Sequence, residues 1–354
     1  MSAYSGVVLS SRRGTTYDAT MESTFRWGIL GCGRIAEAFA IGLEPHEDQV
    51  LVAVASRDVD RARTFAARHP GRQLVPRAYD DYSALCRDPE VDAIYVATPH
   101  TFHAEHGKLV IEHGKALLLE KPFTVHEREA IEVIELARAR DVFCMEAMWT
   151  RFRPAMVHAL SLLRDGEIGT PEMVHASFGF RAPFDPAGRH FDKGLAGGAL
   201  LDVGVYCVSL ADLVFDAPIT ARSSLATIGT TGVDERSGYL LAFEGGGLAV
   251  LSSAVRTDTS HDARIDGSKG SIVISDFWRP TSVRAIQAGY TREWTFDEPG
   301  NGYGWQALEV AKCVRQGLSE SPLRPLEATL RVQRELDRLR QPWGLRYAAD
   351  RVSS

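Results

Sequence analysis

Apolar residues in the first part of the chain form short continuous runs, each followed by a segment in which they recur every three or four positions. Such runs are typical of buried strands, and the longer period is typical of helices that pack through one face. The predicted strands are 25–30, 50–55, a short one around Leu74, 93–97, 116–119 and 142–146. The helices predicted between them are 35–43, 60–69, 82–87, 103–113 and 127–139. This alternation predicts an α/β domain with a doubly wound parallel sheet.

After about Trp149 the pattern changes, because apolar and polar residues alternate along the next predicted strands. Alternation indicates strands with one buried face, and the short turns between them indicate antiparallel pairing. These strands are 172–181, 223–228, 238–243, 248–255, 263–266, 271–275 and 283–288. The helices of this part are 154–165, 198–214, 303–316 and 326–340. The second domain is therefore predicted to be α+β, with an open, mostly antiparallel sheet covered by helices on one face.

The other face of that sheet predicts self-association. If Phe178, Phe180 and further apolar side chains lie on it, a partner must bury them, since monomers rarely expose apolar patches beyond several hundred Å². We therefore expect a homodimer or a higher homo-oligomer.

The patterns divide the chain into three segments. Residues 1–24 show no period and are rich in Ser, Thr, Gly and Tyr, so we expect either a disordered leader or a start assigned too far upstream, in which case Met21 is the first residue of the working protein. Residues 25–148 form the predicted parallel-sheet domain, and residues 149–347 form the predicted α+β domain.

Composition excludes several classes of function. The 354 residues carry 40 Lys and Arg against 46 Asp and Glu, for a net charge of −6, and no basic face for nucleic acid is evident. No apolar run approaches the roughly 18 residues that span a bilayer, so no membrane contact is expected. The five cysteines are far apart, which predicts no disulfide framework, no metal site and a reducing, cytoplasmic location.

The first predicted strand leads into Gly31-x-Gly33-x-x-Ala36. This spacing allows a tight turn, close approach of a pyrophosphate and close packing of the following helix, whose amide groups at Arg34 and Ile35 then bind phosphate. The motif by itself can also be a structural glycine turn. Its place after the first strand of a βαβ series favours a Rossmann domain for a dinucleotide.

The end of the second strand distinguishes the two nicotinamide dinucleotides. An acid there binds the ribose 2′-hydroxyl of NAD, whereas an arginine accommodates the 2′-phosphate of NADP. Here the strand ends Ala55-Ser56-Arg57, and the nearest acids, Asp58 and Asp60, come later. We therefore predict NADP, with NAD possible. Arg57 as a solvated turn residue is the alternative.

Further chemical groups follow the later strands. Thr98-Pro99-His100, with His103 one turn on, and Glu120-Lys121-Pro122 come at strand ends, where open α/β sheets bind ligands. The predicted cofactor contacts are Gly31, Gly33, Arg34, Ile35, Ser56, Arg57, Thr98, Pro99, His100, His103, Glu120 and Lys121.

A lysine and a tyrosine predict a proton-transfer site. Asp202 and Tyr206 are four residues apart, so a helix places them on one face, although a surface helix with a half-buried tyrosine gives the same spacing. We expect the Lys121 ammonium to lower the pKa of Tyr206, which exchanges a proton with the substrate oxygen while a hydride moves to or from the nicotinamide. Asp202 orients the pair or holds the substrate hydroxyl.

Together these motifs resemble the glucose-fructose oxidoreductase and inositol dehydrogenase family, also called Gfo/Idh/MocA. The resemblance covers residues 25 to about 347, and its motifs are 31–36, 98–103, 120–122 and 198–206. The segments 146–152, 202–207 and 320–326 look most like the branch of dimeric dihydrodiol dehydrogenase and glucose-fructose oxidoreductase. That branch uses NADP(H) with a lysine and a tyrosine, whereas sugar and inositol dehydrogenases usually carry histidine where this chain has Tyr206.

The resemblance implies that Lys121 and Tyr206 are catalytic, that Asp202 belongs to the site and that the peptide bond from Lys121 to Pro122 is cis. It also implies that the open sheet forms a subunit interface. The substrate pocket would be lined by Trp149, Arg151 and Phe152. In the loop facing the same crevice, the candidates are Arg181, His190 and Lys193.

These observations predict an NADP(H)-dependent oxidoreductase that acts on a hydroxyl or carbonyl carbon of a sugar, a polyol or a trans-dihydrodiol. Two alternatives remain open: a sugar-sugar oxidoreductase with tightly bound NADP, and a non-catalytic NADP-binding sensor or partner protein.

Overall fold

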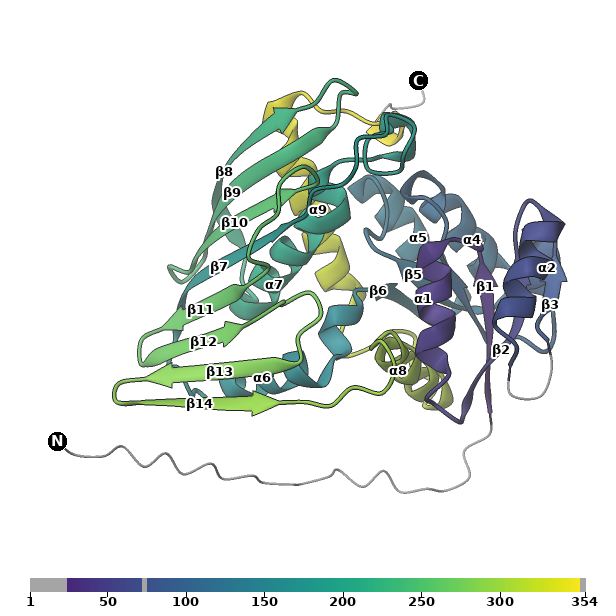
Figure 1. The fold of residues 1–354 in the computed structure, drawn as a ribbon, viewed down its shortest axis with the longest axis horizontal. Helices are drawn as coiled ribbons and strands as arrows, with labels where there is room; N and C mark the ends of the chain where they lie inside the picture. Colours follow the sequence, from purple (N-terminus) through teal and green to yellow (C-terminus); the bar gives the residue numbers. More distant parts are fainter. Residues whose placement is uncertain (1–23, 72–74, 351–354) are drawn as a thin grey trace.

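The computed structural model describes residues 24–71 and 75–350. The predicted leader, Thr24 apart, and the strand expected at Leu74 fall outside these residues. The described chain forms two sheets, with helices packed between and around them (Figure 1).

The first sheet is parallel throughout, as the sequence predicts. Its strands, in the order β3-β2-β1-β4-β5-β6, run outward on both sides of β1, which is the doubly wound arrangement. The strands are β1 (Phe25–Leu30), β2 (Gln49–Ala55), β3 (Arg77–Tyr79), β4 (Ala93–Val96), β5 (Ala116–Glu120) and β6 (Cys144–Ala147). The helices are α1 (Arg34–Leu43), α2 (Val59–Arg68), α3 (Tyr82–Arg87), α4 (His103–Glu112) and α5 (Glu127–Arg140).

The second sheet has the order β14-β13-β12-β11-β7-β10-β9-β8. All of its pairings are antiparallel except that of β7 with β10. Its strands are β7 (Pro171–Gly179), β8 (Ile219–Ile228), β9 (Asp234–Phe243), β10 (Leu248–Ala254), β11 (Ala263–Gly267), β12 (Gly270–Ile274), β13 (Ser282–Gln287) and β14 (Tyr290–Thr295). The sequence pattern missed β14, because this edge strand exposes most of its side chains and therefore lacks alternation.

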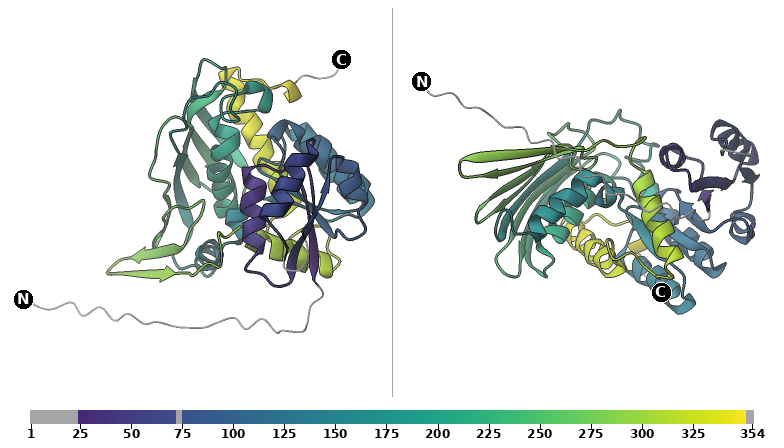
Figure 2. Two further views of the ribbon diagram at one scale, coloured as in Figure 1. Left: turned by 45° about the vertical axis from the view of Figure 1, so that its right-hand side comes forward. Right: turned by 90° about the horizontal axis from the view of Figure 1, so that it is seen from below.

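The helices of the second half are α6 (Pro154–Arg164), α7 (Val205–Phe215), α8 (Gly304–Arg315) and α9 (Leu326–Arg340). Helices α6, α7 and α9 lie on the face of the second sheet that is turned toward the first domain (Figures 1 and 2). Helix α8 lies elsewhere than the sequence predicts, since it packs beside α1 and buries Ala307 and Val310 in the same core as Trp27. The first domain is therefore completed by a helix from the far end of the chain.

The prediction for the free face of the second sheet is wrong at Phe178. That side chain is buried on the helix-covered face, where its ring contacts Tyr206, and Phe180 is half-buried beside His190. The outer face instead exposes Leu225 by 81% and Leu240 by 48%. The alternating pattern located the strands, but it could not show whether the odd-numbered or the even-numbered residues of each strand face the helices.

One segment corrects the expectation that no stretch is long and apolar enough for a membrane. Lys193–Phe215, a segment of 23 residues, is long and apolar enough for that by length and composition. However, 83% of its apolar window is buried inside the protein, as is typical of a core helix.

Candidate functional site

The turn from β1 to α1 has the conformation of a dinucleotide-binding loop. Gly31 has a φ of +99°, and a Cβ there would lie 2.9 Å from Thr98 Cγ2, so only glycine fits without strain. Gly33 caps α1 with no side-chain hydrogen bond, and a Cβ on it would meet no atom within 4 Å. The first amide groups of α1 therefore face open space, as phosphate binding requires.

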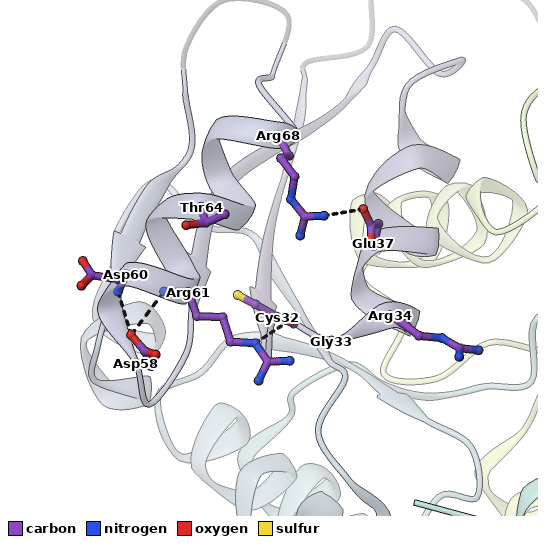
Figure 3. A pocket seen from close by; sticks show the side chains of 9 residues that line it. All are labelled: Cys32, Gly33, Arg34, Glu37, Asp58, Asp60, Arg61, Thr64 and Arg68. Atoms are coloured by element: carbon purple, nitrogen blue, oxygen red, sulfur yellow. Dashed lines mark hydrogen bonds and ion pairs between the residues drawn. The ribbon is translucent and has the colours of Figure 1, made fainter. Parts of the chain in front are cut away.

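A cavity of about 420 Å³ adjoins this loop at the end of β2 (Figure 3). It is lined by Cys32, Gly33, Arg34, Glu37, Asp58, Asp60, Arg61, Thr64 and Arg68. Figure 3 shows Arg61 reaching from α2 to the glycine loop, where its Nε donates to the backbone oxygen of Cys32 at 3.0 Å. The carboxylate of Asp58 caps α2 by accepting hydrogen bonds from two backbone N–H groups.

Arg61 is a candidate cofactor residue that sequence reasoning missed. Arg57, the predicted residue, is exposed and lies over the Phe102 ring at 5.9 Å, whereas Arg61 lines the cavity itself. Helical spacing could not reveal it, because Arg57 precedes α2, which begins at Val59.

The remaining predicted cofactor residues follow the carboxyl ends of the parallel strands. Ser56 follows β2, Thr98 and Pro99 follow β4, and Glu120 ends β5. Burial raises the pKa of Glu120 to about 7, and its carboxylate accepts a hydrogen bond from the Tyr95 hydroxyl at 2.5 Å. The parallel topology thus brings these segments to one edge of the sheet.

The two predicted histidines serve to connect loops. Both ring nitrogens of the fully buried His103 lie 2.8 Å from backbone oxygens, those of Thr98 and Pro122. The side chain therefore links these two loops, and a cofactor contact of His103 stays a prediction. His100 Nδ1 lies 3.2 Å from the Ala196 oxygen and so links the cofactor side to the second domain.

Lys121, directly after β5, links the first domain to the second. The following peptide bond, to Pro122, is cis, which confirms the expectation from the resemblance. Lys121 Nζ donates to the backbone oxygen of Asp202 at 2.7 Å and to its carboxylate at 3.2 Å. Burial opposes ionisation of Asp202, but Lys121 and Arg189 outweigh it and hold the pKa of this carboxyl well below its usual range.

Tyr206 is the second residue of α7, which directly follows a π-helical turn at Leu200–Gly204 that carries Asp202. Its hydroxyl oxygen accepts a hydrogen bond from Trp149 Nε1 at 2.9 Å, and Lys121 Nζ lies 5.1 Å from its ring centroid. Burial, with a smaller contribution from Glu120, raises the pKa of Tyr206 well above its ordinary value.

The expectation that Lys121 lowers the pKa of Tyr206 is therefore wrong. The ammonium is bonded to Asp202 and lies over the phenol ring, and desolvation dominates. At neutral pH the site holds a protonated phenol, which can donate a proton but is a poor base.

The loop before the π turn contributes one predicted and one missed residue. His190 Nε2 lies 3.5 Å from the Asp202 carboxylate, and the neighbouring Arg189 donates to it at 3.0 Å. Arg181 and Lys193 are exposed side chains away from this carboxylate. Arg189 was missed because an arginine in a polar loop gives no periodic signal.

Only one of the three predicted substrate residues lies beside Tyr206, namely Trp149. Phe152 is buried in the first domain's core with Ala307, so it cannot line the substrate pocket. Arg151 lies in a separate cavity of about 340 Å³ and donates to the Leu323 oxygen. After β6 the chain forms a tight 3₁₀ turn, which points these consecutive side chains in different directions.

Known proteins share both domains. Residues 25–148 match the GFO_IDH_MocA oxidoreductase family, NAD-binding Rossmann fold, and residues 156–273 match the family's C-terminal domain. Trans-1,2-dihydrobenzene-1,2-diol dehydrogenase of Xenopus tropicalis is 36% identical over 339 residues, covering 91% of this chain and 99% of that protein. Its namesake from Homo sapiens is 34% identical over 341 residues, covering 92% of this chain and 99% of that protein.

A solved structure shows the same arrangement. KijD10, a 3-ketoreductase from Actinomadura kijaniata in complex with NADP and TDP-benzene, is 25% identical, with a TM-score of 0.79 over 90% of this chain and 98% of that chain. The glycine loop and the strand-end residues fit a nicotinamide dinucleotide, and the length of the match leaves neither domain without a counterpart. The chain belongs to the GFO/IDH/MocA family of NAD(P)-dependent oxidoreductases.

Proposed function

We propose that the chain interconverts a secondary hydroxyl and a carbonyl on a cyclic substrate with vicinal hydroxyls, a trans-dihydrodiol or a sugar. The observation that carries this proposal is the buried, protonated phenol of Tyr206 beside Lys121, at the carboxyl edge of the dinucleotide-binding sheet. The relatives named trans-1,2-dihydrobenzene-1,2-diol dehydrogenases support the dihydrodiol, and the 3-ketoreductase supports a carbonyl as the reduced form of the reacting group.

In the reducing direction Tyr206 donates its hydroxyl proton to the carbonyl oxygen of the substrate. The bound nicotinamide supplies the hydride to the carbonyl carbon. Lys121, fixed by Asp202, holds a positive charge near the oxygen where negative charge develops. In the oxidising direction the Tyr206 phenolate takes the hydroxyl proton, so that direction is favoured by alkaline pH.

We propose NADP(H) as the preferred cofactor. Arg34 and Arg61 line the cavity at the end of β2, and neither is paired with a carboxylate within the described residues. Asp58, the acid closest to the strand end, is used to cap α2. Unpaired guanidinium groups suit the 2′-phosphate dianion of NADP.

We also propose that the chain forms a homodimer through the outer face of the second sheet. Leu225, Leu240 and Val250 are exposed there, and Leu240 and Val250 are direct neighbours on adjacent strands. Three expectations from the sequence remain predictions: a cytoplasmic location, the absence of nucleic-acid and membrane partners, and a domain boundary between residues 148 and 149.

A substrate panel tests the proposed activity. Trans-dihydrodiols, sugars, anhydro-sugars and dicarbonyl compounds are each incubated with NADP or NADPH, and the absorbance of NADPH is followed. We expect turnover of a vicinal diol or of its keto form, with NADP preferred to NAD. Binding of NADP without turnover of any compound in the panel would favour the sensor alternative.

A further inference from the structure

Trp149 is immobilised beside the proposed proton donor. Its indole is 3% exposed, and the Tyr303 ring stacks on it with the centroids 4.1 Å apart. The Arg153 guanidinium lies 4.9 Å from the indole centroid and is itself held by an ion pair with Glu298. An indole covered in this way offers little surface to a substrate.

The indole N–H of Trp149 is aimed at the reacting oxygen of Tyr206. It donates to that oxygen at 2.9 Å, and both residues are buried. Across the part of the chain that the structure describes, no other hydrogen bond reaches this oxygen. Because one of its lone pairs is occupied by the indole, the phenol must direct its own proton elsewhere.

Charged groups from several elements face Tyr206. Glu120, at the end of β5, and Asp202, in the π turn, oppose a phenolate there, whereas Arg189 from the preceding loop favours it. Lys121 lies over the ring, but both it and Arg189 are bonded to Asp202. Two neutral phenols also lie near, those of Tyr95 and Tyr303. A phenolate at this position therefore needs a direct hydrogen-bond donor.

We propose that Trp149 is a positioning residue for proton transfer, whose indole N–H holds the Tyr206 oxygen and stabilises the phenolate left when the proton passes to the substrate. The inference rests on the proposed function, in which Tyr206 exchanges that proton. A hydrogen bond to an ionised oxygen is stronger than one to a neutral oxygen, so the N–H contributes most after the proton has left. Its loss therefore lowers kcat, whereas loss of a substrate contact raises KM.

Trp149→Phe tests this role, because it keeps an aromatic ring and removes the N–H. We expect kcat for reduction of the keto form of the fastest substrate in the panel to fall at least tenfold with KM within twofold, because reduction is the direction that leaves the phenolate. The matched control is Trp278→Phe. Trp278 is an adjacent indole, 6.0 Å from Trp149 between centroids, whose N–H has no partner in the described residues. This control should lose less than threefold.

A double variant separates positioning from packing. In a Tyr206→Phe background, Trp149→Phe should lower kcat less than twofold, because the hydroxyl oxygen that accepts the indole hydrogen bond is absent. Equal losses in the two backgrounds, or a raised KM with unchanged kcat, would overturn the inference.

A substrate-free measurement keeps the inference separate from the proposed function. The ultraviolet absorbance of tyrosinate at a fixed alkaline pH, taken as the difference from Tyr206→Phe, reports ionisation of Tyr206 alone. We expect a smaller ionised fraction in Trp149→Phe, together with an upward shift of about one pH unit in the pH dependence of kcat. An unchanged ionised fraction contradicts the role of Trp149. Undiminished turnover by Tyr206→Phe contradicts the proposed function instead.

Discussion

At the scale of single residues, burial determines the protonation state of Tyr206. A phenol in water has a pKa near 10, and removal from water disfavours its charged form. Here burial raises that pKa further, although a lysine lies 5.1 Å from the ring centroid. The resting site therefore holds a proton to give, and carbonyl reduction is the direction that starts from the resting protonation state.

Removal of the Tyr206 hydroxyl tests this assignment. General acid-base groups contribute about 10²–10⁴ in rate, so Tyr206→Phe should reduce kcat by that factor. Affinity for NADP should stay unchanged, since the glycine loop and the cavity at the end of β2 are distant from the phenol in sequence and belong to the other domain. Initial rates and fluorescence titration with NADPH measure both quantities. A residual turnover above about a tenth of the unmodified enzyme would assign the proton to another group, with His190 the nearest candidate.

Lys121 is expected to act together with Tyr206. Lys121→Met removes the ammonium that Asp202 fixes, and kcat should fall at least as far as in Tyr206→Phe. Residues that act as one unit are not additive, so the double variant should lose much less than the product of the two single losses. Single-turnover rates of the three variants at one pH provide the comparison. A fully multiplicative loss would mean that the two residues act independently.

Arg61 provides a test of cofactor preference. Its guanidinium lines the cavity at the end of β2, so Arg61→Ala should weaken NADP binding by about 1.5–3 kcal/mol, the range for a hydrogen bond to a charged group. Arg57→Ala should have a similar effect only if its exposed side chain turns toward the ligand. Binding of NAD should barely change in either variant. Arg63→Ala, on the exposed side of the same helix, is the control in calorimetric titrations. Equal weakening of NAD and NADP would contradict this assignment.

At the scale of elements, the two glycines of the turn between β1 and α1 have different roles, one in the backbone conformation and one in ligand binding. Gly31 is required by its positive φ and by the atoms around it, whereas Gly33 adjoins only open space. Gly31 is therefore needed for the backbone conformation of the turn, whereas Gly33 leaves room for a bound ligand.

Two glycine substitutions separate these roles. Gly31→Ala should lower the free energy of unfolding by about 1–3 kcal/mol, the cost of an unfavourable backbone conformation, besides the contact with Thr98. Gly33→Ala should leave stability nearly unchanged but weaken dinucleotide binding, because the new methyl group occupies the space in front of the helix amides. Urea denaturation and NADPH titration of both variants test the difference. Equal destabilisation by the two changes would contradict it.

At the scale of the whole molecule, the proposed dimer rests on the outer face of the second sheet. Leu240→Glu places a charge beside Val250 on the outer face, so it should convert the dimer to a monomer with little loss of fold. Leu318→Glu is the matched control, since that leucine is 40% exposed and lies outside the sheet. Light scattering at micromolar concentration distinguishes the two states. A monomer in the unmodified protein would exclude the proposed dimer.

The sequence by itself determined most helices and strands and, apart from α8, the order of elements in the first domain. Buried strands, helix periods and the glycine motif are local patterns, and the parallel order of strands places Gly31, Thr98 and Lys121 at one edge without further information. The spacing of four residues also selected Asp202 and Tyr206 as a pair. It did not reveal that Asp202 lies in a π-helical turn and Tyr206 in the α-helix that follows.

Only the tertiary structure decided where side chains from distant segments meet. It buried Phe178 and Phe152 and moved α8 onto the first domain. It also brought Arg189 to Asp202 through a loop without a periodic pattern. It also set the protonation of Tyr206, because desolvation depends on everything packed around a group, whereas sequence spacing suggests only its nearest charges. Local pattern therefore selected most of the candidate residues, whereas packing decided which groups surround each of them.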